Sequence, residues 1–265
     1  MATKHQKSQT AHHYILNTNP LLYNLILIQE PWIDLYGNTR GNHHWHIIYP
    51  TNRYTKGHNT IRGIILVNTN ISTDAYTPLP IPHSDITAIY LKGELGYCSI
   101  FNIYNDCTNN STINALHTYF HSNLASILPS PTDHMLWLGD FNRHHPLWEE
   151  DKNQRLFNPP HLIDPLIDII QIYDMDLALP QGIPTYKSVV GNWMRPDNVW
   201  KSNNPLNLII SCDIKPSMHP PKADHLPIIM ILDLSIPHAT HFPTCNMRQV
   251  NFTALNDTLW SCLET

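Results

Sequence analysis

The sequence predicts an α/β fold, on three observations. Short apolar runs rich in β-branched residues alternate with fewer segments in which apolar residues recur at helical spacing. Several of the short runs are continuously apolar, as at residues 64–67 and 228–232, which is typical of strands buried on both faces. The chain has 265 residues, 42% of them hydrophobic, and it carries no internal repeat, so we predict one large domain.

The predicted elements follow from these patterns in chain order. Eight β-rich runs predict strands at residues 24–29, 45–49, 63–68, 86–91, 97–104, 135–138, 208–212 and 228–234. Helical spacing predicts helices at 11–16, at 113–127 after a capping-type run, and at 162–173 after a Pro-Pro break. Residues 235–248 are rich in Pro, His and Thr and predict a linker, followed by a short amphipathic helix at 252–263.

Composition restricts the partners and the compartment. The net charge is −5 with neutral histidines, which argues against nucleic-acid binding through bulk positive charge, although protonation of the 18 histidines would change that balance. Charge alone therefore neither implies nor excludes a nucleic-acid partner. Five dispersed cysteines without a C-x-x-C pair indicate reduced thiols. Because no signal-peptide core or membrane-length apolar stretch is visible, we expect a soluble intracellular protein without a membrane partner.

Acidic residues stand where predicted strands end. Glu30 closes the run at 24–29, Asp140 follows the run at 135–138, and Asp224-His225 precedes the run at 228–234. Active sites of α/β folds are often built at such positions, because the sheet fixes the side chains and the loops admit substrate. Each signal is weak alone, since Glu-Pro commonly ends a solvated strand and Gly-Asp-Phe-Asn is rich in turn formers.

Taken together and in order, these motifs resemble a known family. The set comprises Glu30, Asn102-Ile103-Tyr104-Asn105, Gly139-Asp140-Phe141-Asn142, Arg195-Pro196-Asp197-Asn198 and Ala223-Asp224-His225-Leu226-Pro227. It resembles the endonuclease/exonuclease/phosphatase superfamily, and the runs 27–33 and 139–148 are most similar to the endonuclease domain of non-LTR (LINE-type) retrotransposons. The resemblance covers residues 8–234, which leaves 235–265 as a linker and the start of a C-terminal extension.

The resemblance implies a fold, a reaction and a cofactor. The fold would be a four-layer α/β sandwich, with two mixed β-sheets face to face and helices on the outside. The reaction would be Mg²⁺-dependent, or Mn²⁺-dependent, hydrolysis that nicks one DNA strand and leaves a 3′-hydroxyl. It also implies action in the nucleus and a reverse transcriptase in the parent element, which is absent from this chain.

The resemblance further implies a role for each motif residue around the scissile phosphate. Glu30 would ligate the metal and Asp224 would complete the polar cluster near it, while Asp140 would position or deprotonate the attacking water. The remaining groups would contact or orient the phosphate: Asn142 and Tyr104 by hydrogen bonds, His225 as a cationic imidazole fixed by Asp197, and Thr185 by hydrogen bonds around the site.

Several of these residues have a plainer interpretation. His225 could be an ordinary loop histidine, Tyr104 a strand tyrosine at the surface, and Asp197 a turn residue. Arg143 and His144 follow the Gly-Asp-Phe-Asn motif and would contact DNA, or else belong to a loop packed on its own aromatic residue. The histidines at 43–46 are more typical of a solvated loop than of a metal site, because no acid or thiol is spaced to complete the coordination.

The chain departs from the family pattern at its start. Family members begin with a strand that carries a metal-placing asparagine, whereas here Lys4 or His5 stands at that position and we expect the strand to be missing or degenerate. A lysine there would compete with the metal. Ala223 also replaces a common serine. Two other functions therefore stay open: a pseudo-enzyme that binds DNA or protein without cutting, and a superfamily phosphatase.

Overall fold

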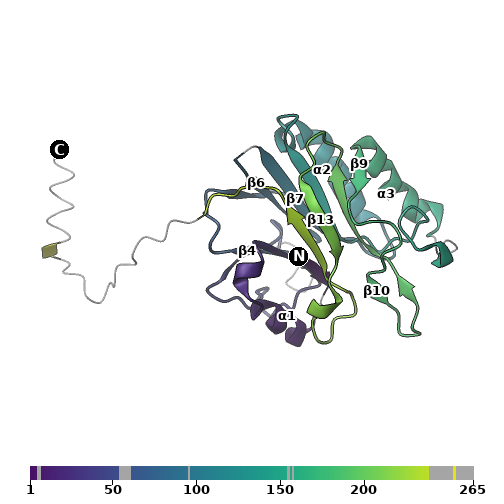
Figure 1. Cartoon of the computed structure of the whole chain (residues 1–265), viewed down its shortest axis with the longest axis horizontal. Coiled ribbons are helices and arrows are strands. Elements are labelled where there is room, and N and C mark those ends of the chain that lie inside the picture. Colours follow the sequence, from purple (N-terminus) through teal and green to yellow (C-terminus); the bar gives the residue numbers. More distant parts are fainter. Residues whose placement is uncertain are drawn as a thin grey trace.

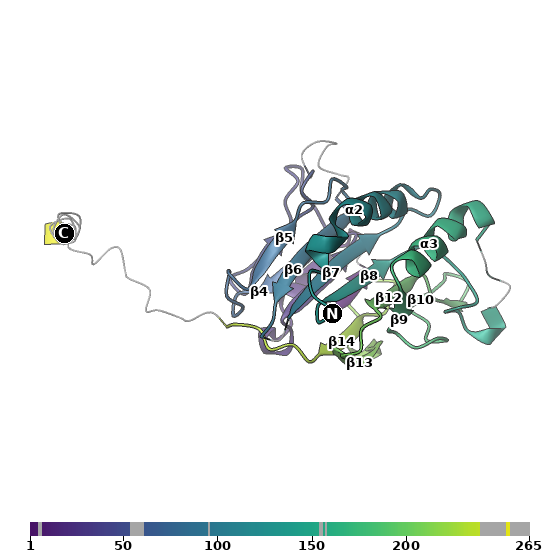
Figure 2. The same ribbon diagram turned by 90° about the horizontal axis from the view of Figure 1, so that it is seen from above.

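Two six-stranded β-sheets pack face to face, with helices on the outer face of each (Figure 1, Figure 2). The computed structural model describes residues 1–4, 7–53, 61–94, 96–153, 156, 158–238 and 253–254. Helix α1 (Gln9–Leu16) covers one sheet, whereas α2 (Ser111–Ile127) and α3 (Pro160–Ile172) cover the other. The four-layer α/β sandwich is therefore confirmed.

The strands and short helical turns have the following bounds. The first sheet has the order β13-β14-β1-β2-β4-β3, with β1 at Ala2–Lys4, β2 at Leu25–Gln29, β3 at Trp45–Ile48, β4 at Gly63–Asn68, β13 at Ile209–Ile214 and β14 at Ile228–Leu232. The second has the order β5-β6-β7-β8-β12-β9, with β5 at Tyr76–Leu79, β6 at Ile86–Lys92, β7 at Tyr97–Tyr104, β8 at His134–Asp140, β9 at Met175–Leu177 and β12 at Asp197–Ser202. A two-stranded ribbon comprises β10 (Tyr186–Lys187) and β11 (Trp193–Met194), and 3-10 turns occur at Pro20–Leu22, Asp151–Asn153 and Pro216–Met218.

Strand β4 illustrates why the central strands are continuously apolar. Ile64 and Leu66 lie in the apolar cluster beneath α1, whereas Ile65 and Val67 lie in the cluster between the two sheets. Successive side chains of a strand point to opposite faces, so a strand between two apolar layers needs apolar residues at every position.

Of the two alternatives for the start of the chain, the missing strand is wrong, whereas the departure from the family motif remains, because Lys4 ends the strand and no asparagine lies in it. β1 is short, but it lies inside the first sheet, parallel to β2 and antiparallel to β14. Its sequence, Ala-Thr-Lys, offers no apolar run, so local pattern could not reveal it. The neighbours on either side supply its backbone hydrogen-bond partners, and a three-residue strand is stable there because its partners are themselves fixed by the sheet.

The C-terminal part of the domain continues slightly beyond β14. Residues 235–238 hydrogen-bond with the domain, through Glu94 N to Ser235 O and Ser72 N to Pro237 O. The rest of the expected linker and the amphipathic helix at 252–263 lie outside the described residues, apart from 253–254.

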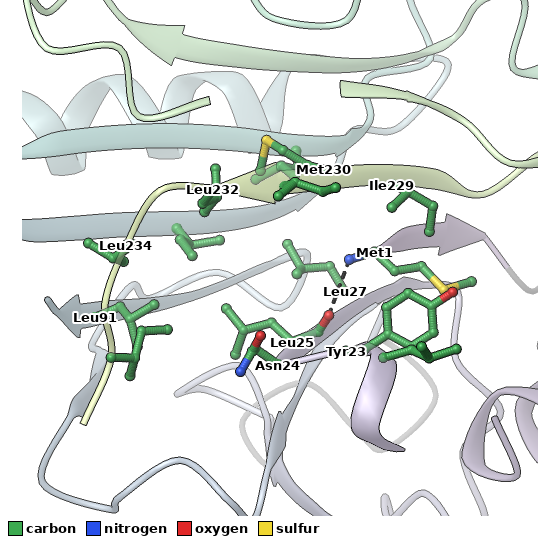
Figure 3. Close-up of a pocket in the computed structure, with 15 residues that line it drawn as sticks. Met1, Tyr23, Asn24, Leu25, Leu27, Leu91, Ile229, Met230, Leu232 and Leu234 are labelled. Carbon is green, nitrogen blue, oxygen red and sulfur yellow. Dashed lines mark hydrogen bonds between the residues drawn. The ribbon is translucent and has the colours of Figure 1, made fainter. Parts of the chain in front are cut away.

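An apolar pocket of about 470 Å³ lies between the sheets (Figure 3). Leu25 and Leu27 of the first sheet and Leu91 and Leu138 of the second are among its lining residues. The buried amino group of Met1 lies beside it and donates a hydrogen bond to the carbonyl oxygen of Leu25. This pocket is near the start of β2, whereas the acidic residue Glu30 follows its end.

The described residues contain no helix long and apolar enough to cross a membrane. Among them, Cys98, Cys107 and Cys212 are free thiols, as expected, and the two other cysteines of the chain lie outside the described residues.

Candidate active site

Strand directions bring five polar residues to one end of the sandwich. In the first sheet, β1 runs parallel to β2, so Lys4 lies beside the residue that precedes Glu30. In the second sheet, β7 runs parallel to β8 with Tyr104 opposite Asp140, and antiparallel β12 begins with Asp197 opposite the same aspartate. Residues far apart in the sequence therefore meet because strand ends of both facing sheets coincide.

Asp140 is fully buried at the centre of this group. Its Oδ1 accepts a hydrogen bond of 3.0 Å from the backbone N–H of Asn142, and its Oδ2 lies 2.8 Å from Lys4 Nζ. Burial raises the pKa of this carboxyl, and the Lys4 ammonium opposes the rise. The carboxylate is thus held in a dry environment with one cationic partner.

Gly139 allows β8 to carry Asp140 so close to β7. Its φ of +146° is one that L side chains rarely adopt, and a Cβ there would lie 1.9 Å from the carbonyl oxygen of Ile103. No side chain can occupy that space, so only glycine fits. The glycine of the Gly-Asp-Phe-Asn motif is therefore required by strand contact.

Two asparagines join the loops that follow β7 and β8. Asn142, with φ of +49°, donates through Nδ2 to the carbonyl oxygen of Asn105 at 2.7 Å. Asn105 in turn donates through its own Nδ2 to the carbonyl oxygen of Phe141 at 2.9 Å and through its backbone N–H to that of Asp140 at 2.8 Å. These reciprocal bonds fix the position of Asp140. The role of Asn105 was missed, although the residue stands inside a quoted motif.

His225, Asp197 and Thr185 form a buried hydrogen-bonded chain. His225 Nδ1 and Thr185 Oγ1 each donate to Asp197 Oδ2 at 2.6 Å. Burial lowers the pKa of the imidazole, but the charge and hydrogen bond of Asp197, with Asp140 beyond, outweigh it, so the pKa is raised. Nε2 of this histidine lies 3.8 Å from Asp224 Oδ2. The arrangement favours a cationic imidazole with a fixed orientation.

Lys4 bridges the two sheets at the site. Its Nζ lies 2.8 Å from Asp140 Oδ2 and 3.6 Å from Glu30 Oε2, and the residue is 9% exposed. Burial acts to lower the pKa of Lys4, yet the two carboxylates more than compensate, so it is raised and the ammonium stays charged. Glu30 itself has φ of +48° and a half-buried side chain.

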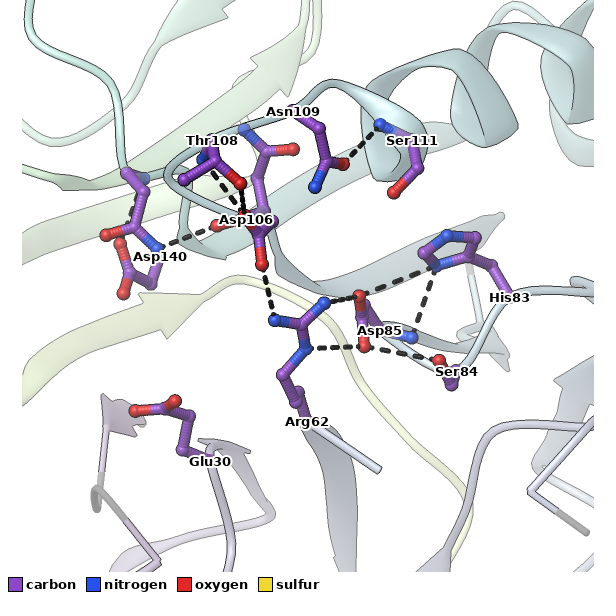
Figure 4. A network of polar contacts seen from close by, with 12 residues as sticks. Glu30, Arg62, His83, Ser84, Asp85, Asp106, Thr108, Asn109, Ser111 and Asp140 are labelled. Atoms are coloured by element: carbon purple, nitrogen blue, oxygen red, sulfur yellow. Dashed lines mark hydrogen bonds and ion pairs between the residues drawn. The ribbon is translucent and has the colours of Figure 1, made fainter. Parts of the chain in front are cut away.

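Arg62 forms a second cationic group beside Tyr104. Its guanidinium lies 4.6 Å from the ring centre of Tyr104 and donates hydrogen bonds to Asp85 and to Asp106 (Figure 4). Hydrogen bonds from Thr108, with that of Arg62, lower the pKa of Asp106 to about 2. One sequence signal points to this group, which is that Arg62 directly precedes the strand predicted at 63–68.

Tyr104 is buried, and burial together with the nearby Glu30 raises the pKa of its phenol. Its ring lies 5.5 Å from Lys4 Nζ on one side. The neutral phenol is therefore maintained at ordinary pH, and a surface position for this tyrosine is excluded.

The expectation that Arg143 contacts DNA is wrong. The side chain is fully buried, and its guanidinium makes five hydrogen bonds, to the carbonyl oxygens of Leu162, Asp106, Asn142 and Asn109 and to Asn110 Oδ1. An arginine has five N–H donors, so none is left for a phosphate. Arg143 instead ties the site loop to neighbouring segments.

His144 differs from Arg143 because its side chain is half-exposed. Its Nδ1 lies 2.6 Å from Glu149 Oε1, which orients the ring. Trp148, in the same loop, is fully buried and donates through its indole nitrogen to the carbonyl oxygen of Arg143 at 3.1 Å. The loop is therefore packed on its own aromatic residue, and a contact of His144 with DNA stays a prediction.

The residues fit a divalent ion only in part. Asp140, Asp197 and His225 offer ligand atoms that lie within 4.8 Å of one another, so this set could hold a metal. However, the ammonium of Lys4 already lies between the carboxylates of Glu30 and Asp140. A divalent cation in the same gap would meet like charge at contact distance, so in this arrangement it does not fit there.

Comparisons with known proteins agree with this fold. Residues 98–229 match the family model described as endonuclease-reverse transcriptase. The endonuclease domain of TRAS1, a telomere-specific non-LTR retrotransposon, superposes with a TM-score of 0.66 at 14% identity, covering 88% of this chain and 97% of that one. The AP endonuclease LMAP from Leishmania major gives 0.64 at 12% identity, covering 86% and 85%. An AP endonuclease from Archaeoglobus fulgidus gives 0.57 at 14%, covering 88% and 98%. No curated protein sequence matches the chain.

The fold and the site together define an α/β two-sheet sandwich with a buried acidic and imidazole cluster at one end, the fold of several solved nucleases. Over residues 98–229 the chain matches an endonuclease-reverse transcriptase family model, and its fold is that of the endonuclease/exonuclease/phosphatase superfamily.

Proposed function

We propose that the chain is a phosphodiester hydrolase that nicks DNA. The convergence of Asp140, Asp197 and His225 within 4.8 Å carries the proposal, since it places a buried carboxylate beside a cationic imidazole. Solved proteins of the same fold include an endonuclease domain of a non-LTR retrotransposon and AP endonucleases. A base for water and positive donors for a developing phosphorane are what this hydrolysis requires.

In the proposed reaction, Asp140 accepts the proton of the attacking water. Its burial raises its pKa, which makes the carboxylate a better base than a solvated one. Water adds to phosphorus, its proton passes to Asp140, and the bond to the 3′ oxygen breaks. That oxygen takes up a proton from solvent, and Asp140 later returns its proton to solvent, so the products are a 3′-hydroxyl and a 5′-phosphate.

Three further groups would stabilise the charge on the phosphate. His225 would donate from Nε2 to a non-bridging oxygen, while Asp197 holds Nδ1. Asn142 uses one amide hydrogen on Asn105 and keeps a second for the phosphate. Tyr104 would add a phenolic hydrogen bond, and Thr185 would keep Asp197 in place.

The charge of Lys4 opposes binding of the expected Mg²⁺ or Mn²⁺ between Glu30 and Asp140. Glu30 and Asp224 supply the oxygen ligands that such ions prefer. Because Lys4 lies between Glu30 and Asp140, the steps above use groups of the chain alone.

The proposal extends to the use of the nick and to the DNA substrate. A nick that leaves a 3′-hydroxyl can prime synthesis by a reverse transcriptase encoded in the parent element. We therefore propose nuclear DNA as the partner.

Lys4 also favours a second candidate, a protein of this fold that binds DNA without cutting it. Among the described residues, the carboxylates of Glu30, Asp140, Asp197 and Asp224 are in direct contact with Lys4 and His225, whereas Arg62 is paired with Asp85 and Asp106. A net negative site without a divalent ion repels the scissile phosphate.

Conversion of supercoiled plasmid to open circles tests the two candidates. With Mg²⁺ or Mn²⁺, wild type should nick, while Asp140→Asn and His225→Gln should reduce the rate at least about 100-fold. Nicking that survives both substitutions would contradict the mechanism. Plasmid retention in a gel-shift assay without any nicking would support the binding protein instead.

A further inference from the structure

Among the described residues, Lys4 contacts acidic groups of the site that come from both sheets. Its Nζ lies 2.8 Å from Asp140 Oδ2 in the second sheet and 3.6 Å from Glu30 Oε2 at the end of the first. All three side chains are shielded from solvent, since the side-chain exposure is 11% for Lys4, 0% for Asp140 and 19% for Glu30. The ammonium therefore lies in a gap between two carboxylates from facing sheets.

Strand pairing of the Lys4 backbone places its side chain in this gap. β1 lies between β14 and β2, and its register places Lys4 opposite Gln29, directly before Glu30. Lys7 N donates to the carbonyl oxygen of Glu30 at 2.7 Å, which ties the chain just after β1 to the same turn. The lysine is thus positioned by an inner strand, unlike a flexible surface lysine.

The carboxylate oxygens of Glu30, which follows β2, and of Asp140, at the end of β8, surround the Lys4 ammonium in the way that ligand oxygens surround a metal ion. A lysine ammonium is a compact positive charge, so carboxylate oxygens can gather around it much as they do around a small cation. A divalent ion and the ammonium cannot share the gap, because their like charges would be separated by only a few ångströms in a poorly solvated place.

We propose that Lys4 is a tethered cation that occupies the position of a divalent ion between Glu30 and Asp140 and so weakens metal binding there. This inference rests on the proposed function, because weak metal binding matters for a site that hydrolyses phosphodiesters. It predicts that the metal affinity of this chain is limited by one side chain and can be restored by replacing it.

Metal binding by the full chain tests the proposal directly. Mn²⁺ binding is followed by the electron paramagnetic resonance signal of the free ion, and Mg²⁺ binding by titration calorimetry. Lys4→Asn removes the charge and adds an amide oxygen, and its Kd should fall at least about ten-fold below that of wild type. Lys4→Met removes the charge alone and should give a smaller gain, while Lys4→Arg keeps the charge and should give none.

A wild-type Kd equal to that of Lys4→Asn overturns the proposal, as does equal tightening by Lys4→Arg. Circular dichroism checks that each variant is folded, because removing Lys4 leaves Asp140 buried without its partner. If Lys4→Asn fails to fold, wild type is compared with Glu30→Gln. A submillimolar wild-type Kd that Glu30→Gln abolishes overturns the proposal, and weak binding that Glu30→Gln leaves unchanged supports it.

Plasmid nicking, measured in parallel, separates this inference from the proposed function. Tighter metal binding by Lys4→Asn without nicking supports the role of Lys4 and contradicts the nuclease. Nicking by wild type with no gain in metal affinity for Lys4→Asn contradicts the role of Lys4 and leaves the nuclease standing.

Discussion

Asn102 of β7 donates through Nδ2 to the carbonyl oxygen of Ile64 at 2.8 Å, across the interface between the two sheets. The same amide group donates to the carbonyl oxygen of Ile28 at 3.1 Å, and Gln29 donates to Asn102 Oδ1. A polar link thus joins the sheets inside an otherwise apolar interface, directly beside the turn that carries Glu30. It holds Glu30 of one sheet at a fixed distance from Tyr104 and Asp140 of the other.

Replacing Asn102 with alanine should destabilise the fold by about 2–4 kcal/mol, because the buried groups of Gln29, Ile28 and Ile64 lose their partner. Chemical denaturation measures the free energy of unfolding. Asn114→Ala, on the exposed face of α2, is the matched control and should change it by less than about 0.5 kcal/mol. Equal changes in the free energy of unfolding for the two substitutions would show that the inter-sheet hydrogen bonds do not stabilise the fold.

Gly139→Ala should abolish or severely reduce folding, with a cost above about 4 kcal/mol, because its Cβ would overlap the Ile103 carbonyl. Gly191→Ala is the control, since Gly191 also has a positive φ, of +89°, but has open space around it. That control should cost only about 1–2 kcal/mol. Thermal unfolding of the two variants separates the steric clash from backbone strain, and similar melting temperatures would contradict the clash.

Arg143→Lys should lower stability by about 3 kcal/mol or more, since most of the five hydrogen bonds are lost inside the protein. DNA affinity, measured on the folded protein by fluorescence anisotropy, should not change. His144→Ala should give the reverse pattern, weaker DNA binding with little change in the melting temperature. If Arg143→Lys binds DNA more weakly than its unfolded fraction explains, Arg143 contacts DNA and its purely structural role is contradicted.

The pH dependence of stability should differ at two buried histidines. Burial lowers the pKa of His12, despite its hydrogen bond to the carbonyl oxygen of Arg40, so the folded state favours the neutral ring. Below about pH 6.5 the unfolded chain binds this proton first, and stability falls as pH falls, by up to about 1.4 kcal/mol per pH unit. The raised pKa of His225 has the opposite sign: its contribution is complete below about pH 6.5 and is lost as pH rises through the raised value.

Denaturation across pH 4 to about 9 measures both effects. His12→Asn should flatten the acid side of the stability profile, and Asp197→Asn should reduce the loss on the alkaline side. In the nicking assay, Asp197→Asn should also move the alkaline fall of the rate to lower pH, because the main cause of the raised His225 pKa is removed. Profiles that coincide with wild type would contradict these assignments.

Local pattern was sufficient for the elements that bury apolar residues on both faces. The predicted strands at 63–68 and 97–104 match β4 and β7 in both bounds, because apolar residues dominate each run even though β7 also carries Ser99 and Asn102. By contrast, β12 was missed, since Asp197 and its neighbours resemble a turn until β8 and β9 supply partners on both sides.

The sequence by itself determined the kinds of chemical group in this protein and their order along the chain, because motifs are local. Only the tertiary structure decided that Lys4 lies between Glu30 and Asp140 and that Arg143 is buried away from any substrate. Both outcomes depend on strand pairing between distant segments, and a side chain's partners are fixed by that pairing and not by its neighbours in sequence.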